Sequence, residues 1–469
     1  MLQRATMSVW DHEACARAHA ASRSVLGRAG VEIGHPDALA LLAGAGARVE
    51  GTRVFIPGAL VDDALAAAPS SFAIPGRGRG GMQLEQGRSW FGTGPDCMYL
   101  HDPVTGTRRR AQLDDVVASA DLCDKLEQVD FIMSMGLPED APLASEDLLQ
   151  FAAMLDGTSK PLIVSTSHGG DGLEAMREMA GACGEPASFG CLTMSSPPLS
   201  FDDDAVDKLI TCARLGIPVI LAPAPSAGAT APASISSAII VGDAEVLAGL
   251  CVHQLARPGA PFVYGVGACA FDMRMAVDAY VIPEAFLANQ AGCDLAHSYG
   301  LPSWAYAGPS DAKALDGQWA AEVAITTLLG ALSRATLLHD LGYMESGKAG
   351  AQEAIVLGAE LVGFARAFMC DLPLDDEALQ IEEIVAVGPR GNHLARPFTR
   401  GHYRDFWKTD LFDHAVYERW QASGGTTLRE RVEQHTRDLL AAERTTRLPD
   451  DTRREFDRII SAVAARRQP

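Results

Sequence analysis

Short apolar runs alternate with longer helical segments between residue 113 and about residue 370. A run of about four to eight apolar residues is typical of a buried parallel strand, whereas a helix needs about ten residues or more. The alternation predicts an α/β fold, a TIM (β/α)8 barrel with one strand missed or irregular, and a doubly wound sheet is the competing architecture. The predicted strands cover residues 131–135, 162–165, 189–194, 219–222, 262–266, 303–306 and 335–338.

The clearest strand-loop-helix unit lies between Gly216 and Gly242. Its apolar strand is followed by a loop rich in Gly, Pro and Ser, which cannot continue a strand or a helix, and then by a helix from about Ser234 to Leu250. Loops after the strands carry the chemistry in α/β barrels, so this loop is a candidate wall of an active site. A membrane span is the alternative, because no charge occurs from Pro218 to Gly242, but four prolines in this segment argue against it.

Two regions flank the predicted barrel, which we assign to residues 113–375. Residues 1–112 are predicted to form an N-terminal α/β cap with three helices, a hairpin over residues 48–56 and a Gly-rich hairpin lid over residues 72–111. Residues 376–469 are predicted to form a C-terminal helical extension that packs on the barrel.

Charge and cysteine usage exclude several classes of partner. The 469 residues carry a net charge of −21, which would repel nucleic acid and anionic membranes, so we expect neither as a partner. The ten cysteines include no C-x-x-C pair and no Cys/His cluster at zinc-ligand spacing, so we expect no bound metal. Cysteines within apolar runs suit a reducing compartment. We expect a cytoplasmic protein that forms a homo-oligomer.

Aromatic, acidic and basic residues gather where the predicted strands end. Because the carboxyl ends of barrel strands meet at one mouth, we expect these side chains to converge. Aromatic rings offer a negative π face to a cation, and a carboxylate balances the charge of a quaternary ammonium, which cannot donate a hydrogen bond. Packing beneath a loop is the alternative for each aromatic residue alone. The residues are His168, Ser195, Ser196, Pro197, Tyr264, Asp272, Trp304, Tyr306, Asp311, Lys313, His339, Asp340, Tyr343 and Glu345, with Tyr99 in the Gly-rich segment.

A set of longer motifs runs along nearly the whole chain. They are VL at residues 25–26 with VEI at 31–33, GTGP at 92–95, PSAGATAP at 225–232, DAEVLAG at 243–249, YGLP at 299–302, SDAK at 310–313 with Asp316 and Gln318, and GPRGNHL at 388–394. Together, in this order, they resemble the trimethylamine methyltransferase family. The resemblance is to members without pyrrolysine, which demethylate glycine betaine and similar quaternary amines.

The resemblance implies a TIM barrel that moves an N-methyl group from a quaternary amine to the Co(I) of a corrinoid on a separate small protein. The chain lacks the Asp-x-His-x-x-Gly motif of corrinoid proteins, so the cobalamin-type cofactor is expected from that partner. We expect catalytic roles for Asp311, His339 and Glu345 and, at the corrin ring, contacts from Ser226, Gly228, Gly265 and Gly267. The residues expected to bind the substrate are Tyr99, His168, Tyr264, Trp304, Tyr306 and Tyr343.

Two other functions are compatible with the sequence. A lyase or aldolase on the same barrel would use Lys313 as a Schiff-base amine, which requires a buried lysine with a lowered pKa. A non-catalytic sensor would bind quaternary amines and transfer nothing. Only standard residues occur, so trimethylamine itself is a poor candidate substrate. An anionic part of the substrate would bind Arg274, Lys313 or His339.

Overall fold

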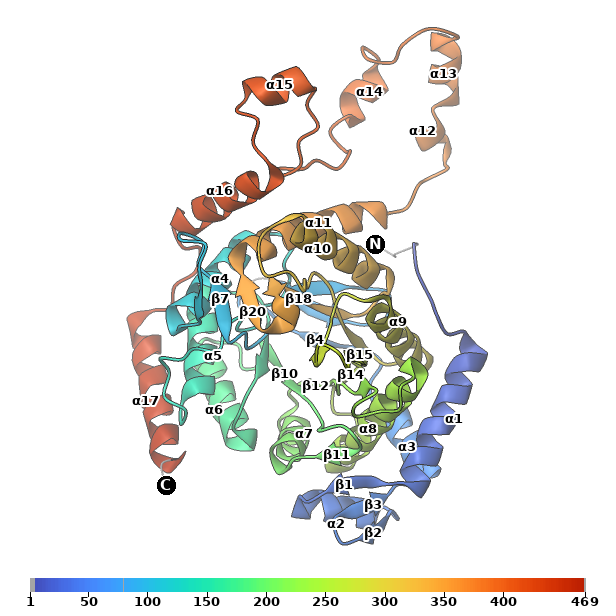
Figure 1. Ribbon diagram of the computed structural model, residues 1–469, viewed down its shortest axis with the longest axis vertical. Coiled ribbons are helices and arrows are strands. Elements are labelled where there is room, and N and C mark those ends of the chain that lie inside the picture. Colours follow the sequence, from blue (N-terminus) through green and yellow to red (C-terminus); the bar gives the residue numbers. More distant parts are fainter. Residues whose placement is uncertain (1–4, 79, 468–469) are drawn as a thin grey trace.

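The computed structural model describes residues 5–78 and 80–467 of the chain. At its centre, a curled parallel sheet of seven short strands is surrounded by helices (Figure 1). These strands are apolar and mostly buried, which explains why hydrophobic pattern located six of them to within about three residues at either end. In spatial order they are β6 (Trp90–Thr93), β18 (Leu337–Leu341), β17 (Ser303–Tyr306), β14 (Phe262–Gly265), β12 (Val219–Leu221), β10 (Phe189–Thr193) and β9 (Leu162–Ser165).

Two residues lie between the edges of this sheet. Phe131 forms an isolated parallel bridge to Gly92 of β6, and Ile132 forms another to Leu162 of β9. Glycine permits the first approach, because a Cβ atom at Gly92 would lie 2.4 Å from the Phe131 ring. The predicted strand over residues 131–135 is reduced to these two bridges, and Met135 leaves the extended conformation with a φ of 58°.

The predicted lid over residues 72–111 is wrong in two respects. β6 belongs to the central sheet, where it pairs in parallel with β18. The hairpin of β4 (Phe72–Ile74) and β5 (Met82–Leu84) packs inside the curl of the sheet, because its alternate side chains are apolar and need a buried surface. Its buried residues Ile74, Met82 and Leu84 belong to one core cluster with Ile163, Ile220, Val263 and Leu337 of the sheet.

A second small sheet follows the carboxyl end of β18. β7 (Tyr99–His101) and β8 (Arg108–Arg110) form the expected antiparallel hairpin. β7 also pairs in parallel with β20 (Ala349–Ala351), which returns from β19 (Tyr343–Met344) through the 3-10 turn η1 (Glu345–Gly347). This sheet therefore brings residues near position 100 next to residues near position 345.

Helices cover the outside of the central sheet (Figure 1). The longest, α8 (Ile235–Ala256), is the one helix among the described residues that has the length and apolar character of a membrane span. It is instead mostly buried, with α1 (His12–Arg28) and α3 (Gly58–Ala67) on one side and α7 (Asp203–Leu215) on another. The other covering helices are α4 (Leu113–Lys125), α5 (Glu146–Gly157), α6 (Gly169–Ala182), α9 (Pro283–Ser298), α10 (Gly317–Leu332) and α11 (Gln352–Phe368).

The N-terminal segment forms the expected helices and hairpin. β2 (Arg48–Glu50) and β3 (Arg53–Phe55) pair antiparallel across the turn at Gly51, as the alternating pattern predicts. They complete a four-stranded sheet with β1 (Val31–Ile33) and β11 (Ser200–Phe201), while α2 (Pro36–Gly44) lies between β1 and β2 in the chain. β11 follows β10, so this small sheet ties the N-terminal segment to the central body.

The C-terminal extension has two parts. α16 (Leu428–Ala441) packs on α11 and α4, and α17 (Asp450–Arg467) packs on α6 and α5. Between α11 and α16, the chain projects from the body as a separate arm (Figure 1). The arm contains α12 (Asp376–Leu379), α13 (Ile381–Val387), α14 (Pro397–His402) and α15 (Tyr417–Ala422).

Candidate active site

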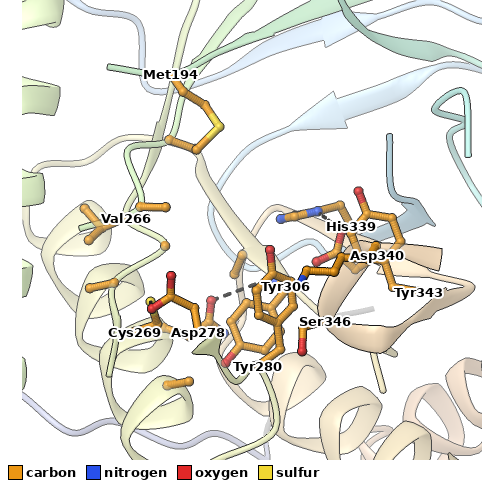
Figure 2. Close-up of a pocket in the computed structure, with 18 of the residues that line it drawn as sticks. Met194, Val266, Cys269, Asp278, Tyr280, Tyr306, His339, Asp340, Tyr343 and Ser346 are labelled. Atoms are coloured by element: carbon orange, nitrogen blue, oxygen red, sulfur yellow. Dashed lines mark hydrogen bonds and ion pairs between the residues drawn. The ribbon is translucent and has the colours of Figure 1, made fainter. Parts of the chain in front are cut away.

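A cavity of about 600 Å³ lies at the carboxyl ends of the central strands (Figure 2). Side chains alternate between the two faces of a strand, so every second residue points into the curled sheet. Ile220 and Leu337 point inward and pack on the hairpin of β4 and β5, which fills the inside of the curled sheet and is called the plug below. The next inward positions, Ala222 and His339, lie beyond the plug and line the cavity. The plug therefore sets the floor of the cavity.

Four aromatic side chains form part of the cavity wall. Trp304 and Tyr306 extend from β17, Tyr343 from β19, and Tyr280 from the chain between β16 (Val277–Asp278) and α9. The Tyr306 ring lies 6.4 Å from the Tyr280 ring and 5.7 Å from that of Phe286. Burial, with a smaller contribution from the charge of Asp340, raises the pKa of Tyr280, Tyr306 and Tyr343 above its ordinary value. These phenols are therefore neutral.

Tyr306 has an additional feature that suits a ligand site. Its hydroxyl is buried and has no hydrogen-bond partner within the part of the chain that the structure describes. An unpaired buried hydroxyl is costly, and its ring faces a cavity rather than the closed core. The hydroxyl is thus available to a bound molecule or to water.

His339 and Asp340 occupy an irregular turn at the end of β18. The pairing of β18 with β6 shifts register between Leu338 and Leu341, and Asp340 has a φ of 82°. Such a bulge redirects side chains, and a positive φ in a non-glycine residue is characteristic of functional sites. Nδ1 of His339 lies 2.5 Å from Oδ1 of Asp340, and the imidazole stacks on the Trp304 indole. Both residues line the cavity.

Glu345 reaches the cavity but is already paired. Its carboxylate accepts two hydrogen bonds from the Arg108 guanidinium, at 2.8 and 3.0 Å, and lies 3.7 Å from Nε2 of His101. Among the described residues, no ion pair joins Asp311 or Glu345 to Lys313 or Lys348. Glu345 thus joins the β7–β8 hairpin to the cavity wall.

A third carboxylate, Asp278, enters from β16. Its Oδ1 accepts hydrogen bonds from the Ser226 hydroxyl at 2.9 Å and the Cys269 thiol at 3.2 Å. Cys269, on β15 (Cys269–Asp272), and Asp278 line the cavity, whereas Ser226, on β13 (Ser226–Ala227), supports them from behind. Burial raises the pKa of Cys269 to about 11, so its thiol is protonated and is a poor nucleophile.

Asp311 is a positioning residue in this arrangement. Its carboxylate accepts from the backbone N–H groups of Tyr280 and Val281, at 3.2 and 2.9 Å, and from the Ser346 hydroxyl at 2.7 Å. It does not line the cavity, although Tyr280 and Ser346 do. Asp311 thus holds together two segments that bear cavity residues.

A buried glutamate holds the loop after β10. Glu245 of α8 accepts from the Ser195 hydroxyl at 2.7 Å and from the Leu199 N–H at 2.6 Å. Burial raises the pKa of Glu245 to about 7. This loop carries Met194, whose side chain lines the cavity and is 46% exposed.

The structure brings only part of the predicted set together. His339, Glu345, Trp304, Tyr306, Tyr343 and Gly267 line the cavity. Tyr264 instead donates to the buried Asp243 at 2.7 Å, Tyr99 lies under Arg108, and His168 stands at the start of α6 near Asp147. The remaining predicted residues outside the cavity lining are Asp311, Ser226, Gly228 and Gly265.

The cavity residues that the sequence reasoning missed include two polar ones and one aromatic one with a clear place in the wall. Asp278 and Tyr280 lie on the excursion between β14 and α9, and Asn289 lies on α9 itself. The sequence feature that could have identified Asp278 and Tyr280 is the length of the segment between β14 and α9, since a long loop after a barrel strand is commonly functional. Of the candidate anion-binding groups, Arg274 has a side chain that is 92% exposed and lies outside the cavity lining, whereas Lys313 and His339 contribute to it.

Lys313 does not fit the Schiff-base role that the sequence left open. Lys313 is exposed and donates to the Asp311 carbonyl at 2.6 Å, so it lacks the burial that a Schiff-base lysine requires. Within residues 5–78 and 80–467, no group of three or more His, Cys, Asp or Glu residues has the geometry of a metal site.

Comparison with known proteins identifies the family of the chain. The family model "Trimethylamine methyltransferase (MTTB)" matches residues 2–468. The trimethylamine methyltransferase MttB of Methanosarcina thermophila is 30% identical over 92% of this chain and 93% of its own length. The glycine betaine methyltransferase of Desulfitobacterium hafniense strain Y51 is 27% identical over 86% of each chain.

The fold is also similar to a solved structure. The monomethylamine methyltransferase MtmB of Methanosarcina barkeri superimposes with a TM-score of 0.53 at 14% sequence identity, covering 93% of this chain and 88% of its own. At that identity the likeness concerns the fold alone. The family assignment rests on the match over residues 2–468, and the chain belongs to the trimethylamine methyltransferase family.

Proposed function

We propose that this protein transfers a methyl group from a quaternary ammonium compound to the cobalt of a corrinoid carried by a separate protein. Membership of the trimethylamine methyltransferase family supports methyl transfer from an amine, and the relative named glycine betaine methyltransferase supports a quaternary amine. The observation that carries the proposal is the cavity, which is lined by five aromatic side chains, Phe271 of β15 among them, and by three carboxylates.

The cavity has the chemistry that a quaternary ammonium requires. Trp304, Tyr280 and Tyr306 offer ring faces, and each cation–π contact contributes about 0.5 to 2 kcal/mol, more when water is excluded. Asp340 is 2% exposed and Asp278 is shielded by Ser226 and Cys269, so both can balance the positive charge in a region of low dielectric. The ligand cannot donate a hydrogen bond, so ring faces and charge must bind it.

Methyl transfer from this substrate needs little from the protein in proton chemistry. The departing tertiary amine is neutral, so no general acid must protonate it. A corrinoid in the Co(I) state supplies the nucleophile that accepts the methyl group. The contribution of the cavity is to orient one N–CH3 bond toward the open mouth and to exclude water from the cation. His339, stacked on Trp304 and held by Asp340, positions the indole face for this purpose.

The rim of the cavity suits the approach of a flat, largely apolar group from a partner. Met273 and Met275 are 68% and 70% exposed, in the turn between β15 and β16, and Met194 and Val277 contribute further exposed apolar surface. Flexible methionines are common at surfaces that accept partners. Gly267 lies on the same rim and has no side chain to obstruct an approaching group. We propose that this rim faces the corrin ring.

The proposal includes one assignment of the fold and one of the cellular location. We infer that Phe131 and Ile132 occupy the position of an eighth strand, so that the curled sheet acts as a (β/α)8 barrel with its site at the carboxyl end. We also infer a cytoplasmic location, because all ten cysteines are free thiols, as a reducing compartment would keep them.

A binding experiment tests the recognition of charge. The probes are glycine betaine and 3,3-dimethylbutanoate, its analogue with a nearly isosteric, uncharged tert-butyl group, together with choline and its carbon analogue 3,3-dimethylbutan-1-ol. Isothermal titration should give at least tenfold tighter binding for the charged member of at least one pair. Equal affinity within each pair that binds would contradict recognition through ring faces and carboxylates.

A further inference from the structure

One wall of the cavity is formed by the inner face of α9. Ala285 and Asn289 both line the cavity, and they lie four residues apart, so they occupy the same face of the helix. Asn289 is 6% exposed and carries the one side-chain amide of the cavity lining among the described residues. A buried amide needs hydrogen-bond partners for its oxygen and for its nitrogen.

Strand β17 sets the orientation of the Asn289 amide. Its Oδ1 accepts from the backbone N–H of Tyr306 at 3.4 Å. A backbone N–H can only donate, so the oxygen faces β17 and the NH2 group faces away from it. No described residue accepts a hydrogen bond from Nδ2, and this nitrogen is not sealed from solvent. Because Asn289 meets solvent at the cavity, the two N–H donors of Nδ2 point into it.

The Tyr280 hydroxyl is a second free donor on the same wall. The Tyr280 ring lies 6.4 Å from the Tyr306 ring, and Figure 2 shows the two side chains next to each other. Asp311 holds the backbone of Tyr280, whereas its hydroxyl makes no hydrogen bond to a described residue. Burial raises the pKa of Tyr280, so the phenol stays protonated and its O–H remains a donor.

Three other hydroxyl and thiol groups of the lining already donate within the protein. The Ser346 hydroxyl donates to Asp311 at 2.7 Å, the Cys269 thiol donates to Asp278 at 3.2 Å, and the Tyr343 hydroxyl donates to a backbone carbonyl. Asn289 and Tyr280 differ from these three residues because no acceptor in the described chain faces them. An unpaired buried donor is costly, and a ligand that brings an acceptor removes that cost.

The acceptor cannot be the ammonium group, because a quaternary nitrogen has no lone pair. It must belong to another part of the substrate, which we call the tail. The cavity of about 600 Å³ has room for a tail beside the ammonium head, since small-molecule sites occupy about 300 to 1,000 Å³. A few placed polar groups in such a site fix the orientation of the ligand.

We propose that Asn289 and Tyr280 bind a carbonyl oxygen in the tail of the substrate, either of a carboxylate or of a neutral carbonyl group. This inference rests on the proposed function, because the ring faces and carboxylates must hold the cationic head. The basic groups considered for an anionic tail are less suited. Lys313 is exposed and donates to the Asp311 carbonyl, and Arg274 lies outside the cavity lining. A tail held on α9 also orients the N–CH3 bonds of the head.

Three cations of similar size test this tail subsite by isothermal titration of the full chain. Glycine betaine has a carboxylate tail, 2-oxopropyltrimethylammonium has a neutral carbonyl, and (2-methylpropyl)trimethylammonium has no oxygen. The wild type should bind at least one carbonyl ligand about tenfold or more tightly than the ligand without oxygen, because only the carbonyl pairs both donors. The affinities of the first two ligands identify which kind of carbonyl the subsite takes.

Asn289→Asp is the most informative variant, because it keeps an oxygen toward the Tyr306 N–H and replaces two donors with an acceptor. Binding of the preferred carbonyl ligand should weaken about tenfold or more, whereas binding of the ligand without oxygen should not weaken. Tyr280→Phe keeps the ring and should show the same selective loss. Asn392→Asp is the matched control, since Asn392 is exposed on the arm between α11 and α16 and should leave all three affinities unchanged.

Two results would overturn the subsite. One is equal affinity of the wild type for all three cations. The other is a loss in Asn289→Asp and Tyr280→Phe that is the same for the ligands with and without a carbonyl group. Either result leaves binding of a quaternary amine intact, so the proposed function would stand while the tail subsite would not.

Discussion

The imidazole of His339 lies flat against the indole of Trp304, with ring centroids 4.2 Å apart and ring planes at 12°. The two residues sit on adjacent parallel strands, β18 and β17, and both face the cavity. Asp340 holds the imidazole at Nδ1, so one edge of the aromatic wall is fixed by its own neighbours. The wall is therefore set before a ligand arrives, which reduces the entropic cost of binding.

Replacing the indole tests its contribution to cation binding. Trp304→Leu should weaken binding of a quaternary amine by about 0.5 to 2 kcal/mol, or roughly 2- to 30-fold, because one ring face is lost. Titration calorimetry measures the change. Binding of the uncharged tert-butyl analogue serves as control and should change less. An equal loss for both ligands would mean that Trp304 acts through packing alone.

Tyr306 allows ring and hydroxyl to be separated. Tyr306→Phe should keep the affinity for a quaternary amine within about threefold, since the ring remains and the hydroxyl has no partner in the described structure. Tyr306→Leu should lose the cation–π contribution of about 0.5 to 2 kcal/mol. The Kd values of the two variants decide the matter, and a Phe variant as weak as the Leu variant would assign the role to the hydroxyl.

Two aspartates should respond differently to the same isosteric change. Asp340→Asn removes a charge beside the cation, so binding of the quaternary amine should weaken at least tenfold, or about 1.4 kcal/mol. The positive φ of Asp340 is one that Asn also adopts, so the melting temperature should stay close to that of the wild type.

Asp311→Asn should instead lower the melting temperature. Its carboxylate clamps the Tyr280–Val281 backbone and Ser346, and an amide can accept at only one of its two positions. Thermal unfolding and binding are compared for both variants. A loss of affinity in Asp311→Asn without loss of stability would restore the direct role that the sequence suggested.

Glu245 predicts a defined pH dependence of stability. Its pKa is about 7 in the fold, against an ordinary value of 4.5 for an exposed glutamate, so the folded state binds the proton more tightly. This contribution to the free energy of unfolding is complete below about pH 4.5 and is lost as pH rises through about 7, by up to about 3 kcal/mol. The free energy of unfolding of Glu245→Gln, relative to that of the wild type, should therefore be larger at pH 8 than at pH 5. Chemical denaturation at the two pH values measures this difference, and an equal difference at both would contradict the raised pKa of Glu245.

The hydrophobic pattern was sufficient for six of the seven central strands because each of these six is a short buried run. β9 and β17 have the predicted bounds, whereas residues 131–135 make only two bridges. Sequence could not show that the hairpin near residue 80 turns inward, because alternating apolar residues fit a plug as well as a lid. Only the packing of Ile74 and Leu84 against the sheet distinguishes them.

The candidate site was predictable only where strand ends determine it. Trp304 and His339 follow directly from β17 and β18. Tyr264 shows the limit of this reasoning, since successive residues of a strand face opposite sides and its side chain points outward to Asp243 of α8. The positions of Asp278 and Tyr280 depend on how the long segment between β14 and α9 folds back over the mouth of the cavity. No local sequence pattern predicts that conformation.

The most direct test of the central claim is methyl transfer to Co(I) cobalamin. Purified protein, Co(I) cobalamin and each of glycine betaine, carnitine, proline betaine, choline and trimethylamine are incubated without oxygen, and the absorbance of methyl-Co(III) is followed. We predict that at least one quaternary amine yields methyl-Co(III), that trimethylamine does not, and that Asp340→Asn slows the transfer. Binding of a quaternary amine with no methyl-Co(III) formed, from free or protein-bound corrinoid, would contradict the proposed methyl transfer and indicate a sensor.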